Sequence, residues 1–568
     1  ISQYFTANGR AINPRSAKQV KQNKKDKGTS YSDAYFTMLN DLKLKTTLIC
    51  FLFLTIVSNG FALEEMQLGK EQKFLIKNII IYDGTGVEPY AGEIRIQGER
   101  ITHVYRGKGS NQDSDAGIID GQGLALAPGF IDTHSHHDIG IDQEPTASAA
   151  ITQGVTTIIR GVDGFSDTPG AFNIASDHED YFSVKEFNHY FNKIPTAINM
   201  ASFSAHNSIR IEVMKDDFKR EATAKEISAM ASLIDLDMKS GAYGLSTGLE
   251  YDPGIFASTD EVIELAKVAA NYDGKYKSHI RSEDREYWEA IDETIEVGRQ
   301  AKIPVNIDHF KLNGKFNWGR TNEVLSILDA AREEGINVTA DVYPYEAWSS
   351  SITTLYPERN FNDLKETEFI LENLSSAEDI TFTYHSIHPD YVQKTVADIA
   401  YETGKSEIEM LSHLSDESYR ASTVSSSVEY VVAKGMIDSD VRLLLNWPFS
   451  NVTSDGELRC GHPRGCGTFP KVINNYQGDS GVGSLQRVIH KMTGLSATQI
   501  GIEDRGIIKA GAYADLVLFD PNNTKDNSTF ANPTLKSEGV HSVWVNGVRV
   551  LNNGKFTNNL PGKILIKN

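Results

Sequence analysis

Short runs of apolar and β-branched residues, each ending in turn residues, mark both ends of the chain. Residues 74–82 (FLIKNIIIY) end in the turn Asp-Gly-Thr-Gly, and residues 93–96 alternate apolar and polar positions. Runs of this kind between turn residues predict β-strands and hairpins. The predicted strands are residues 74–82, 93–96, 101–104, 514–520, 543–545 and 548–550. We therefore expect both ends of the chain to contribute to one small β domain around a long middle segment.

The middle of the chain alternates short apolar strands with amphipathic helical stretches. Residues 156–159 and 305–307 are typical of buried strands, and residues 261–270 and 322–334 of helices. Repetition of this kind over some 300 residues favours a parallel α/β architecture, and at that length a (β/α)8 barrel. The alternation of strands and helices stops at about residues 350–440, where the sequence is polar and helical in character. We predict that these residues form an inserted helical segment.

The N-terminal region has the pattern of an export signal. Residues 1–37 are polar and basic, and we interpret them as an extension upstream of Met38. Basic residues, the apolar run 48–57 and the small residues at 58–62 then follow, which predicts a signal peptide at residues 38–62. The alternative is a membrane anchor, but spanning a bilayer takes about 20 apolar residues. We therefore expect an exported protein, periplasmic or extracellular, with no stable membrane anchor after cleavage.

Composition and charge narrow the classes of partner. Of the 568 residues 40% are hydrophobic and 23% charged, which is the balance of a folded globular protein. The formal net charge is −20 and the sequence pI about 5.3. Phosphate backbones would be repelled by this charge, which argues against nucleic acid as a partner.

Cysteine usage predicts a single disulfide. Cys50 lies in the predicted signal peptide, so Cys460 and Cys466 alone remain. Two cysteines so close together in an exported protein favour a bridge between them. The alternative is a pair of free buried thiols.

Histidines fall at the ends of several predicted strands. His134 and His136 follow the turn at residues 127–130, and alternation along a strand puts them on the same side, where they could bind one metal ion. His279 and His309 each close a short apolar strand. In a barrel, active sites lie at the carboxyl ends of the strands, so these four side chains are candidate metal ligands. The alternative is an ordinary histidine of the core or the surface. That alternative suits any one of these positions taken alone, but it fits the four together poorly.

Two aspartates occupy similar positions. Asp163 follows the strand at residues 156–159, and Asp455 follows the apolar stretch that ends at Trp447. Either is a candidate for chemistry at a strand end. The alternative is an ordinary turn aspartate, which residue type and a following glycine also favour.

The chain resembles the amidohydrolase superfamily and, within it, the D-aminoacylase (N-acyl-D-amino-acid deacylase) family. The resemblance runs from about Phe74 onward. The matching stretches are residues 128–136 (PGFIDTHSH), 154–157 (GVTT), 244–249 (GLSTGL), 341–345 (DVYPY), 454–456 (SDG), 462–464 (HPR), 467–470 (GTFP), 514–517 (ADLV) and 545–547 (VNG). The first and the last two are typical of the superfamily, whereas LSTGL, YPY and HPR are typical of the D-aminoacylases.

The resemblance implies a role for each candidate residue. His134 and His136 match the histidines of one metal position, and His279 and His309 those of the other. Asp455 matches the catalytic aspartate. Arg464 matches the arginine that binds the substrate carboxylate. Lys311, Tyr343 and Ser349 match further polar contacts to that carboxylate or to the scissile amide.

The resemblance also implies the domain bounds. A small β-sandwich domain would comprise residues 63–126 and 505–568, and the barrel residues 127–504, with the insertion at about 350–440.

One residue departs from the family pattern. Asp163 stands where D-aminoacylases of the best-known type have a cysteine ligand. Carboxylate binds zinc and also suits manganese or cobalt. We therefore expect one or two zinc ions, with Mn²⁺ or Co²⁺ as alternatives, and Asp163 as a ligand.

These expectations add up to a hydrolase acting on carbon–nitrogen bonds other than peptide bonds. The resemblance implies hydrolysis of N-acyl-D-amino acids by a metal-activated water, with Asp455 moving the proton. One alternative is a dipeptidase acting on dipeptides with a C-terminal D residue. Another is a cyclic-amide hydrolase of the hydantoinase or dihydroorotase kind, although we find no lysine at the strand end where those enzymes carry a modified one. A catalytically inactive scaffold is a further alternative, since barrels host unrelated roles.

Overall fold

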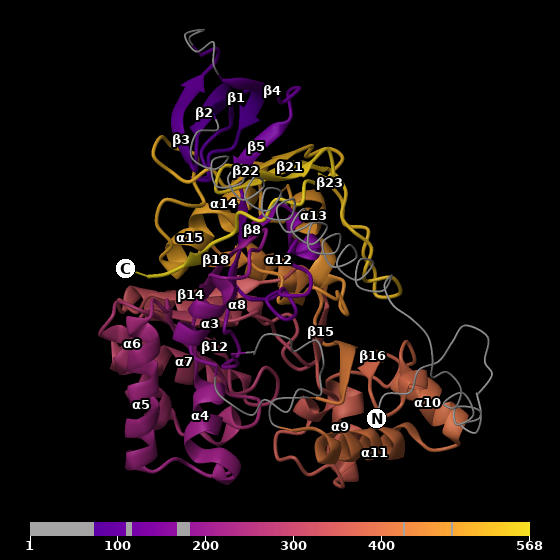
Figure 1. The fold of residues 1–568 in the computed structure, drawn as a ribbon. Helices are drawn as coiled ribbons and strands as arrows, with labels where there is room; N and C mark the ends of the chain where they lie inside the picture. The colour runs from indigo at the N-terminus through magenta and orange to yellow at the C-terminus, as the bar shows by residue number, and fades with distance from the viewer. Residues whose placement is uncertain (1–72, 110–115, 167–181, 424–426, 479–480, 568) are drawn as a thin grey trace, which may run out of the picture. The chain divides into compact units, whose positions relative to one another are not determined.

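Figure 1 shows the computed structural model of the chain. It describes residues 73–109, 116–166, 182–423, 427–478 and 481–567. The predicted signal peptide and the extension before it lie outside the described residues. Within the described ranges, no helix is both long and apolar enough to cross a lipid bilayer.

The two ends of the described chain meet in one sheet. Its order is β23-β22-β21-β20-β5-β1-β2-β3, with β4 paired to β1, and the segments join where β20 runs antiparallel to β5. The strands of this sheet, nine among the described residues, are β1 (Lys73–Ile81), β2 (Tyr90–Gln97), β3 (Arg100–Arg106), β4 (Gly117–Asp120), β5 (Ala125–Pro128), β20 (Leu516–Phe519), β21 (Val540–Val545), β22 (Val548–Asn552) and β23 (Lys555–Phe556). Every strand expected at the two ends of the chain lies in this sheet.

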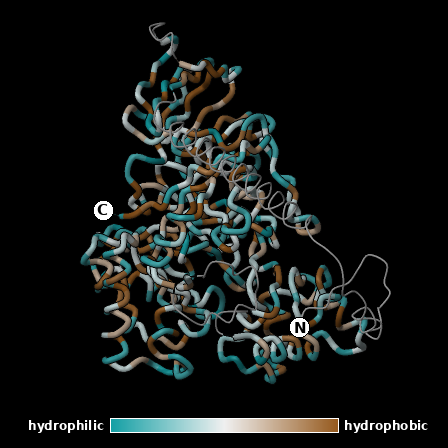
Figure 2. Tube along the Cα trace, in the orientation of Figure 1, coloured by the Kyte–Doolittle hydropathy of each residue, from teal (hydrophilic) through white to brown (hydrophobic). Residues whose placement is uncertain are grey.

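The alternation in these strands explains why the sheet forms. Along β1 every second side chain is buried over most of its length, and Phe74 and Ile76 share a core with Leu516 and Trp544 from the other end of the chain. Brown, hydrophobic stretches follow the strands of this domain in Figure 2. Burial of the apolar side chains on one face of this sheet stabilises the pairing of the two distant segments.

The middle of the chain forms a ring of parallel strands. Their hydrogen-bonded order is β6-β8-β9 and then β10-β11-β12-β13-β14-β18; only Phe203 separates β9 from β10, and β19 pairs with β7 to close the ring. The described residues supply eight barrel strands when β9 and β10 count as one, β7 counts as the continuation of β6 and β19 as the continuation of β18. The strands are β6 (Phe130–Asp132), β7 (Ser135–His136), β8 (Val155–Arg160), β9 (Asn199–Ser202), β10 (Ser204–Ala205), β11 (Gly244–Gly248), β12 (Lys275–His279), β13 (Val305–Ile307), β14 (Val338–Val342), β18 (Ser450–Val452) and β19 (Gly456–Glu457). All six residues of β8 are buried, as parallel strands covered on both faces require.

Helices connect the barrel strands and cover them. Several begin at strong capping residues: the side chain of Ser183 caps α3 with Glu186, and Thr223 caps α5 with Glu226. The helices are α2 (Ser148–Ile151), α3 (Val184–Phe191), α4 (His206–Met214), α5 (Ala224–Lys239), α6 (Thr259–Ala270), α7 (Tyr287–Ala301), α8 (Thr321–Glu333), α12 (Asp438–Asn446), α13 (Arg464–Asn475), α14 (Leu485–Met492) and α15 (Gly494–Ile500), with short 3₁₀ turns η1 (Lys215–Asp217) and η2 (Gly254–Phe256).

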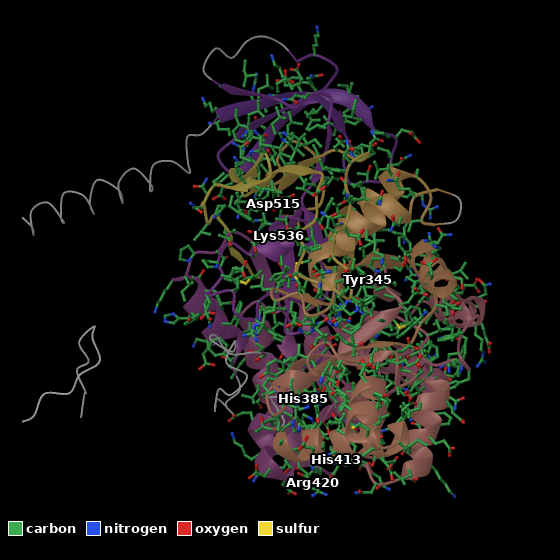
Figure 3. The ribbon with its side chains drawn as sticks, turned by 90° about the vertical axis from the view of Figure 1, so that its right-hand side faces the viewer. Tyr345, His385, His413, Arg420, Asp515 and Lys536 are labelled. Carbon is green, nitrogen blue, oxygen red and sulfur yellow. A yellow bond between two sulfur atoms is a disulfide. The ribbon has the colours of Figure 1, made fainter. Side chains whose placement is uncertain are left out.

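The inserted segment between β14 and α12 is helical only in part, which corrects the expectation of a helical insertion. It contains an antiparallel sheet of order β15-β17-β16. Its elements are β15 (Ala347–Ser350), η3 (Ile352–Leu355), α9 (Leu364–Asn373), β16 (Ile380–His385), η4 (Pro389–Tyr391), α10 (Val396–Thr403), α11 (Glu407–Ala421) and β17 (Glu429–Lys434). Ile380 and Phe382 are buried at alternate positions of β16, a short pattern that the surrounding polar sequence hides. Figure 3 labels His385, at the end of β16, and His413 and Arg420 on α11.

The last strand also differs from expectation. β24 (Ile564–Leu565) pairs in parallel with Met200 and Ala201 of β9, so the end of the chain joins the barrel wall instead of the β domain. Leu565 packs on a small apolar cluster that includes Ile159 and Phe203. The strand β24 lies within the expected domain range 505–568 but pairs outside the sheet of the β domain.

Candidate metal centre

The expected strand-end residues gather at the carboxyl ends of the barrel strands. His134 follows β6 and His136 lies in β7, while Asp163 follows β8. His279 ends β12, and His309 comes two residues after β13. Because all these strands are parallel, their carboxyl ends meet at one face of the ring.

Asp163 lies between the two pairs of histidines. Its Oδ2 is 3.2 Å from Nε2 of His134 and 3.2 Å from Nε2 of His136. Its other oxygen, Oδ1, is 3.2 Å from Nε2 of His309 and 3.9 Å from Nδ1 of His279. One carboxylate therefore faces both pairs, with one oxygen for each.

Asp455 completes the first group and joins it to Arg464. Its Oδ1 lies 3.4 Å from Nε2 of His136 and 3.7 Å from Nε2 of His134. Its Oδ2 lies 2.6 Å from Nη1 of Arg464, and Nη2 of the same arginine donates to the backbone oxygen of Ser349 at 3.3 Å. The guanidinium expected to bind substrate is thus paired with the aspartate expected to move the proton.

The remaining expected contacts lie beside the second pair of histidines. Nζ of Lys311 is 2.9 Å from Nδ1 of His309 and forms an ion pair with Glu283. Tyr343 is buried, and its hydroxyl has no hydrogen-bond partner within the described residues. Its ring lies 5.7 Å from Nζ of Lys311 and 5.0 Å from Cζ of Arg464, so the phenol stands between two cations.

The backbone is in an unusual conformation at three of these positions. Asp163, His309 and Asp455 have φ values of 53°, 34° and 49°, in the left-handed region. Such a conformation costs about 1–3 kcal/mol in a non-glycine residue and persists only when the surroundings fix it. The backbone N–H of Asp455 donates to the oxygen of His134, and that of His309 donates to Oδ1 of Asp341. The fold therefore holds these side chains in place at some cost.

The pKa values of the histidines and aspartates in this centre depend on one another's charges. Burial alone would lower the pKa of His134, but the carboxylates of Asp163 and Asp308 outweigh it and raise the pKa well above the usual value. For His136 burial is likewise outweighed, by Asp163 and Asp455, which raise the pKa to about 10. Burial would raise the pKa of Asp163, yet the histidines around it hold that pKa well below its usual range. The carboxylates and the protonated imidazoles of this group therefore stabilise each other's charges.

Sequence reasoning missed the residues that support the expected ligands. Oδ2 of Asp308 lies 3.3 Å from Nδ1 of His134. Oε2 of Glu250 lies 2.8 Å from Nε2 of His279, and Oε1 of Glu283 lies 3.1 Å from Nδ1 of His309. The one available signal was position: Asp308 directly precedes His309 at a strand end, whereas the two glutamates lie in loops.

The centre opens into a cavity of about 370 Å³. His136, Asp163, Asp455 and Arg464 line it next to the centre. Aromatic and hydroxyl side chains line much of the rest: Phe165, Phe218, Tyr251, Tyr419, Tyr430, Ser349, Ser350, Ser351, Thr353, Thr354, Ser422, Thr423 and Ser427. Its size is within the range of small-molecule sites.

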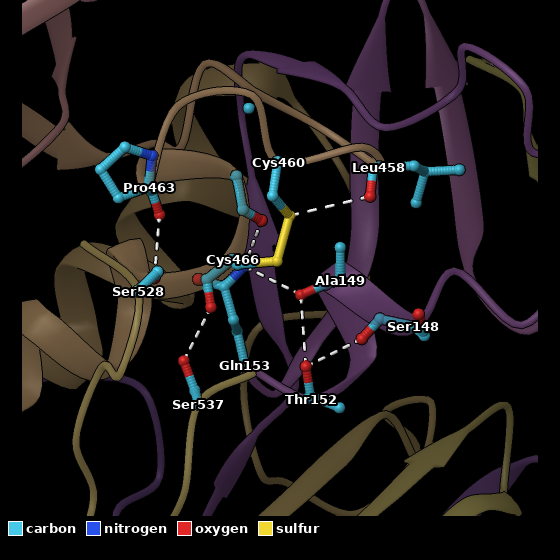
Figure 4. Close-up of a disulfide and its surroundings, with 12 residues drawn as sticks. Ser148, Ala149, Thr152, Gln153, Leu458, Cys460, Pro463, Cys466, Ser528 and Ser537 are labelled. Atoms are coloured by element: carbon cyan, nitrogen blue, oxygen red, sulfur yellow. Dashed lines mark hydrogen bonds between the residues drawn. A yellow bond between two sulfur atoms is a disulfide. The ribbon is translucent and has the colours of Figure 1, made fainter. Parts of the chain in front are cut away.

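Cys460 and Cys466 form a disulfide around the loop that carries Arg464, with Cα atoms 5.7 Å apart (Figure 4). Two serines of the C-terminal segment hold the same loop: Ser528 donates to the oxygen of Pro463 and Ser537 to that of Cys466. Three constraints, the disulfide and two hydrogen bonds, therefore meet on the short stretch before and after Arg464.

The donor set fits a transition metal. His134, His136, Asp163 and Asp455 each offer a ligand atom, all within 4.8 Å of one another, and so do Asp163, His279 and His309. Imidazole nitrogen with carboxylate oxygen suits zinc, manganese and cobalt. The histidine nitrogens face Asp163 directly, which is the convergence that a bound cation requires.

Comparisons with known proteins find relatives over most of the chain. A family model described as the amidohydrolase family matches residues 390–551. The chain is 32% identical over 500 residues to the D-aminoacylase of Alcaligenes xylosoxydans xylosoxydans, covering 86% of this chain and 96% of that protein. It is 31% identical over 504 residues to the N-acyl-D-aspartate deacylase of the same organism, covering 87% of this chain and 94% of that one.

Solved structures give the same result. A crystal structure of D-aminoacylase superposes with a TM-score of 0.76 at 32% identity, covering 87% of this chain and 99% of that one. A structure of N-acyl-D-glutamate deacylase from Bordetella bronchiseptica superposes with a TM-score of 0.76 at 29% identity, covering 87% and 100%. That structure contains zinc and a phosphonate inhibitor that mimics the tetrahedral intermediate. A further structure of D-aminoacylase concerns its binuclear metal centre.

Proposed function

The chain belongs to the D-aminoacylase family of amidohydrolases, and from that membership we propose that it hydrolyses N-acyl-D-amino acids. Water adds to the amide carbonyl, the carbon–nitrogen bond breaks, and the products are a carboxylate and a free D-amino acid. The observation that carries the proposal is the position of Asp163 between two histidine pairs, beside the Asp455–Arg464 ion pair in the same cavity.

We assign two metal positions to the centre. His134, His136, Asp163 and Asp455 would hold one ion, and Asp163, His279 and His309 the other. Zinc is the ion we propose, with manganese or cobalt as alternatives. When bound, such an ion supplies a Lewis acid for the carbonyl and lowers the pKa of a coordinated water.

Asp455 is the residue we assign to proton transfer. Its carboxylate is ionised at neutral pH, because Arg464 and the histidines around it outweigh the effect of burial and lower its pKa. An ionised carboxylate can take the proton from the attacking water and give it to the departing amine. The position of Oδ1, 3.4 Å from Nε2 of His136 in the histidine pair, supports this assignment.

Arg464 is the residue we assign to the α-carboxylate of the substrate. A guanidinium presents two parallel N–H donors to a carboxylate, which an ammonium cannot match. Lys311, Tyr343 and Ser349 lie close enough to add polar contacts around the same group. The preference for D configuration comes from the named relatives, since chirality depends on where the side chain lies relative to this anchor.

Two related reactions are kept as alternatives. A dipeptide with a C-terminal D residue presents the same carboxylate and amide, and the cavity of about 370 Å³ extends beyond the centre. Hydantoin lacks the free α-carboxylate for which Arg464 is suited, whereas dihydroorotate carries one, so the two cyclic amides are tested separately. We also propose, from the sequence of residues 38–62, that the protein is exported.

A panel of substrates tests the proposal against these alternatives. Amine release would be measured from N-acetyl-D-amino acids and from dipeptides with a C-terminal D residue. Ring opening of hydantoin and dihydroorotate releases no free amine, so for these two the N-carbamoyl amino acid product would be measured. We expect the highest kcat/KM for an N-acetyl-D-amino acid. A higher value for a cyclic amide would contradict the assigned substrate class.

A further inference from the structure

A buried lysine lies beneath the metal centre, although no ligand role is assigned to it. Lys277 sits on β12 two residues before His279, so both side chains point to the same side of the strand. The lysine side chain is 1% exposed. A buried ammonium is costly unless it is paired, and this one is paired twice.

Lys277 bridges two aspartates from the neighbouring strands. Its Nζ lies 2.6 Å from Oδ1 of Asp308 and 2.7 Å from Oδ2 of Asp341, and both carboxylates are fully buried. The strand register explains the meeting, because Lys277 pairs with Asn306, and Asn306 pairs with Thr339. Asp308 comes two residues after Asn306, directly after β13, and Asp341 comes two residues after Thr339 in β14.

Each aspartate turns its second oxygen toward one histidine pair. Oδ2 of Asp308 lies 3.3 Å from Nδ1 of His134, and neither atom has another hydrogen-bond partner within the described residues. Oδ1 of Asp341 accepts from the backbone N–H of His309 at 2.6 Å, where the backbone has a φ of 34°. A single aspartate therefore links the ammonium of Lys277 to a ligand of each metal position.

The geometry also shows why a cation belongs at this point. His134, Asp308 and Asp341 have ligand atoms close enough together to hold a metal ion themselves. The ammonium of Lys277 already lies between the two carboxylates. Asn306 donates to both of them as well, at 2.8 and 2.7 Å, so the oxygen of each carboxylate that faces Lys277 has two partners.

We propose that Lys277 is a positioning residue that sets both metal positions through Asp308 and Asp341. By fixing Asp308 it holds Nδ1 of His134 as the donor, so that Nε2 faces Asp163. By fixing Asp341 it holds the backbone bend that aims His309 at the other oxygen of Asp163. The inference rests on the proposed function, because it concerns how this chain orients its metal ligands.

The test compares zinc affinity in Lys277→Met with that in Lys491→Met. Lys491 is a matched control: it is 3% exposed, and its Nζ binds the backbone oxygens of Trp447 and Ser450, not a residue of the centre. Zinc dissociation constants and the number of ions per chain would be measured by chelator competition, in the full protein with its fold checked by circular dichroism. Loss of a supporting partner typically weakens metal affinity about 10–100-fold.

We expect Lys277→Met to weaken both zinc positions by about 10-fold or more and Lys491→Met to leave both unchanged. Folded Lys277→Met with zinc affinity equal to the wild type would overturn the proposal. Equal losses in both lysine variants would also overturn it, because burial alone would then account for the effect. Wild-type protein that binds no zinc would instead contradict the proposed function.

A second pair of variants keeps the inference testable if Lys277→Met does not fold. Asp308→Asn should weaken the position that contains His134 and spare the other, and Asp341→Asn should do the reverse. Cobalt substitution adds a spectroscopic signature, since the visible absorption of Co²⁺ reports the ligands of each position. Losses that do not separate between the two positions would contradict the assigned routes.

Discussion

Arg464 and Asp455 form an ion pair at the centre, with Nη1 of the arginine 2.6 Å from Oδ2 of the aspartate. The guanidinium assigned to the substrate carboxylate therefore already holds the carboxylate assigned to proton transfer. Nε of Arg464 has no hydrogen-bond partner within the described residues, so the arginine keeps a donor for a substrate carboxylate while Nη1 holds Asp455. Binding and chemistry are thus linked through one arginine.

This link predicts how substrates without a carboxylate behave. An N-acetyl-D-amino acid and its C-terminal amide differ only in the group that Arg464 recognises. We expect kcat/KM to fall at least about 100-fold for the amide, because a site built for a charged partner is left unpaired. Comparable values for the two, measured by amine release, would remove Arg464 from the assigned role.

Replacement of Asp455 separates metal binding from turnover. Asp455→Asn keeps the shape of the side chain and an oxygen toward the histidines, but it cannot carry the proton. We expect zinc to be retained and kcat to fall by about 100- to 10,000-fold. The measurement is kcat together with zinc content by elemental analysis. Near-normal turnover in the zinc-loaded variant would contradict the assignment of Asp455 to proton transfer.

The disulfide should affect substrate binding more than chemistry. Cys460 and Cys466 enclose the residues before and after Arg464, so opening the bridge frees the loop that aims the guanidinium. We expect reduction to raise KM several-fold with a smaller change in kcat. The Cys460→Ser/Cys466→Ser double variant is the control, because its KM should already be raised and should not respond to reductant. Unchanged KM after proven reduction would contradict this prediction.

A buried carboxyl in the inserted segment predicts a pH dependence of stability. Glu429 on β17 accepts from Oγ of Ser351 and from the backbone of Ile352, and burial raises its pKa from 4.5 to about 7. The folded protein then holds this proton more tightly than the unfolded chain does. The carboxyl therefore costs stability progressively as pH rises from 4.5 to about 7, and the full cost, about 3 kcal/mol, remains above that pH.

Glu429→Gln removes this cost. Denaturant unfolding should show a variant that gains little at pH 5 and is more stable than the wild type at pH 8. A gain that is equal at both pH values would show that the carboxyl does not titrate in this range.

Much of the centre could be predicted because its ligands end strands. Histidines and aspartates at the ends of apolar runs indicate positions on one barrel face, and the fold brings His134, His136, Asp163, His279, His309 and Asp455 together there. The supporting layer could not be predicted in this way. Lys277, Asp308 and Asp341 meet only through the register of three strands, and register leaves no local mark in the sequence.

Other features escaped prediction for related reasons. The sequence places Asp163 at a ligand position but does not indicate that its two oxygens face two different histidine pairs. β16 and β17 are short strands in polar surroundings, where helical composition outweighs the alternation. β24 pairs with β9, more than 360 residues earlier, so no local pattern distinguishes it from the β domain.

The most direct test of the whole account is amine release from paired N-acetyl-D- and N-acetyl-L-amino acids, before and after chelation and after zinc is returned. We predict release from the D series alone, abolished by chelation and restored by zinc. Release that survives complete removal of metal, or no release from either series in protein shown to carry zinc, would contradict it.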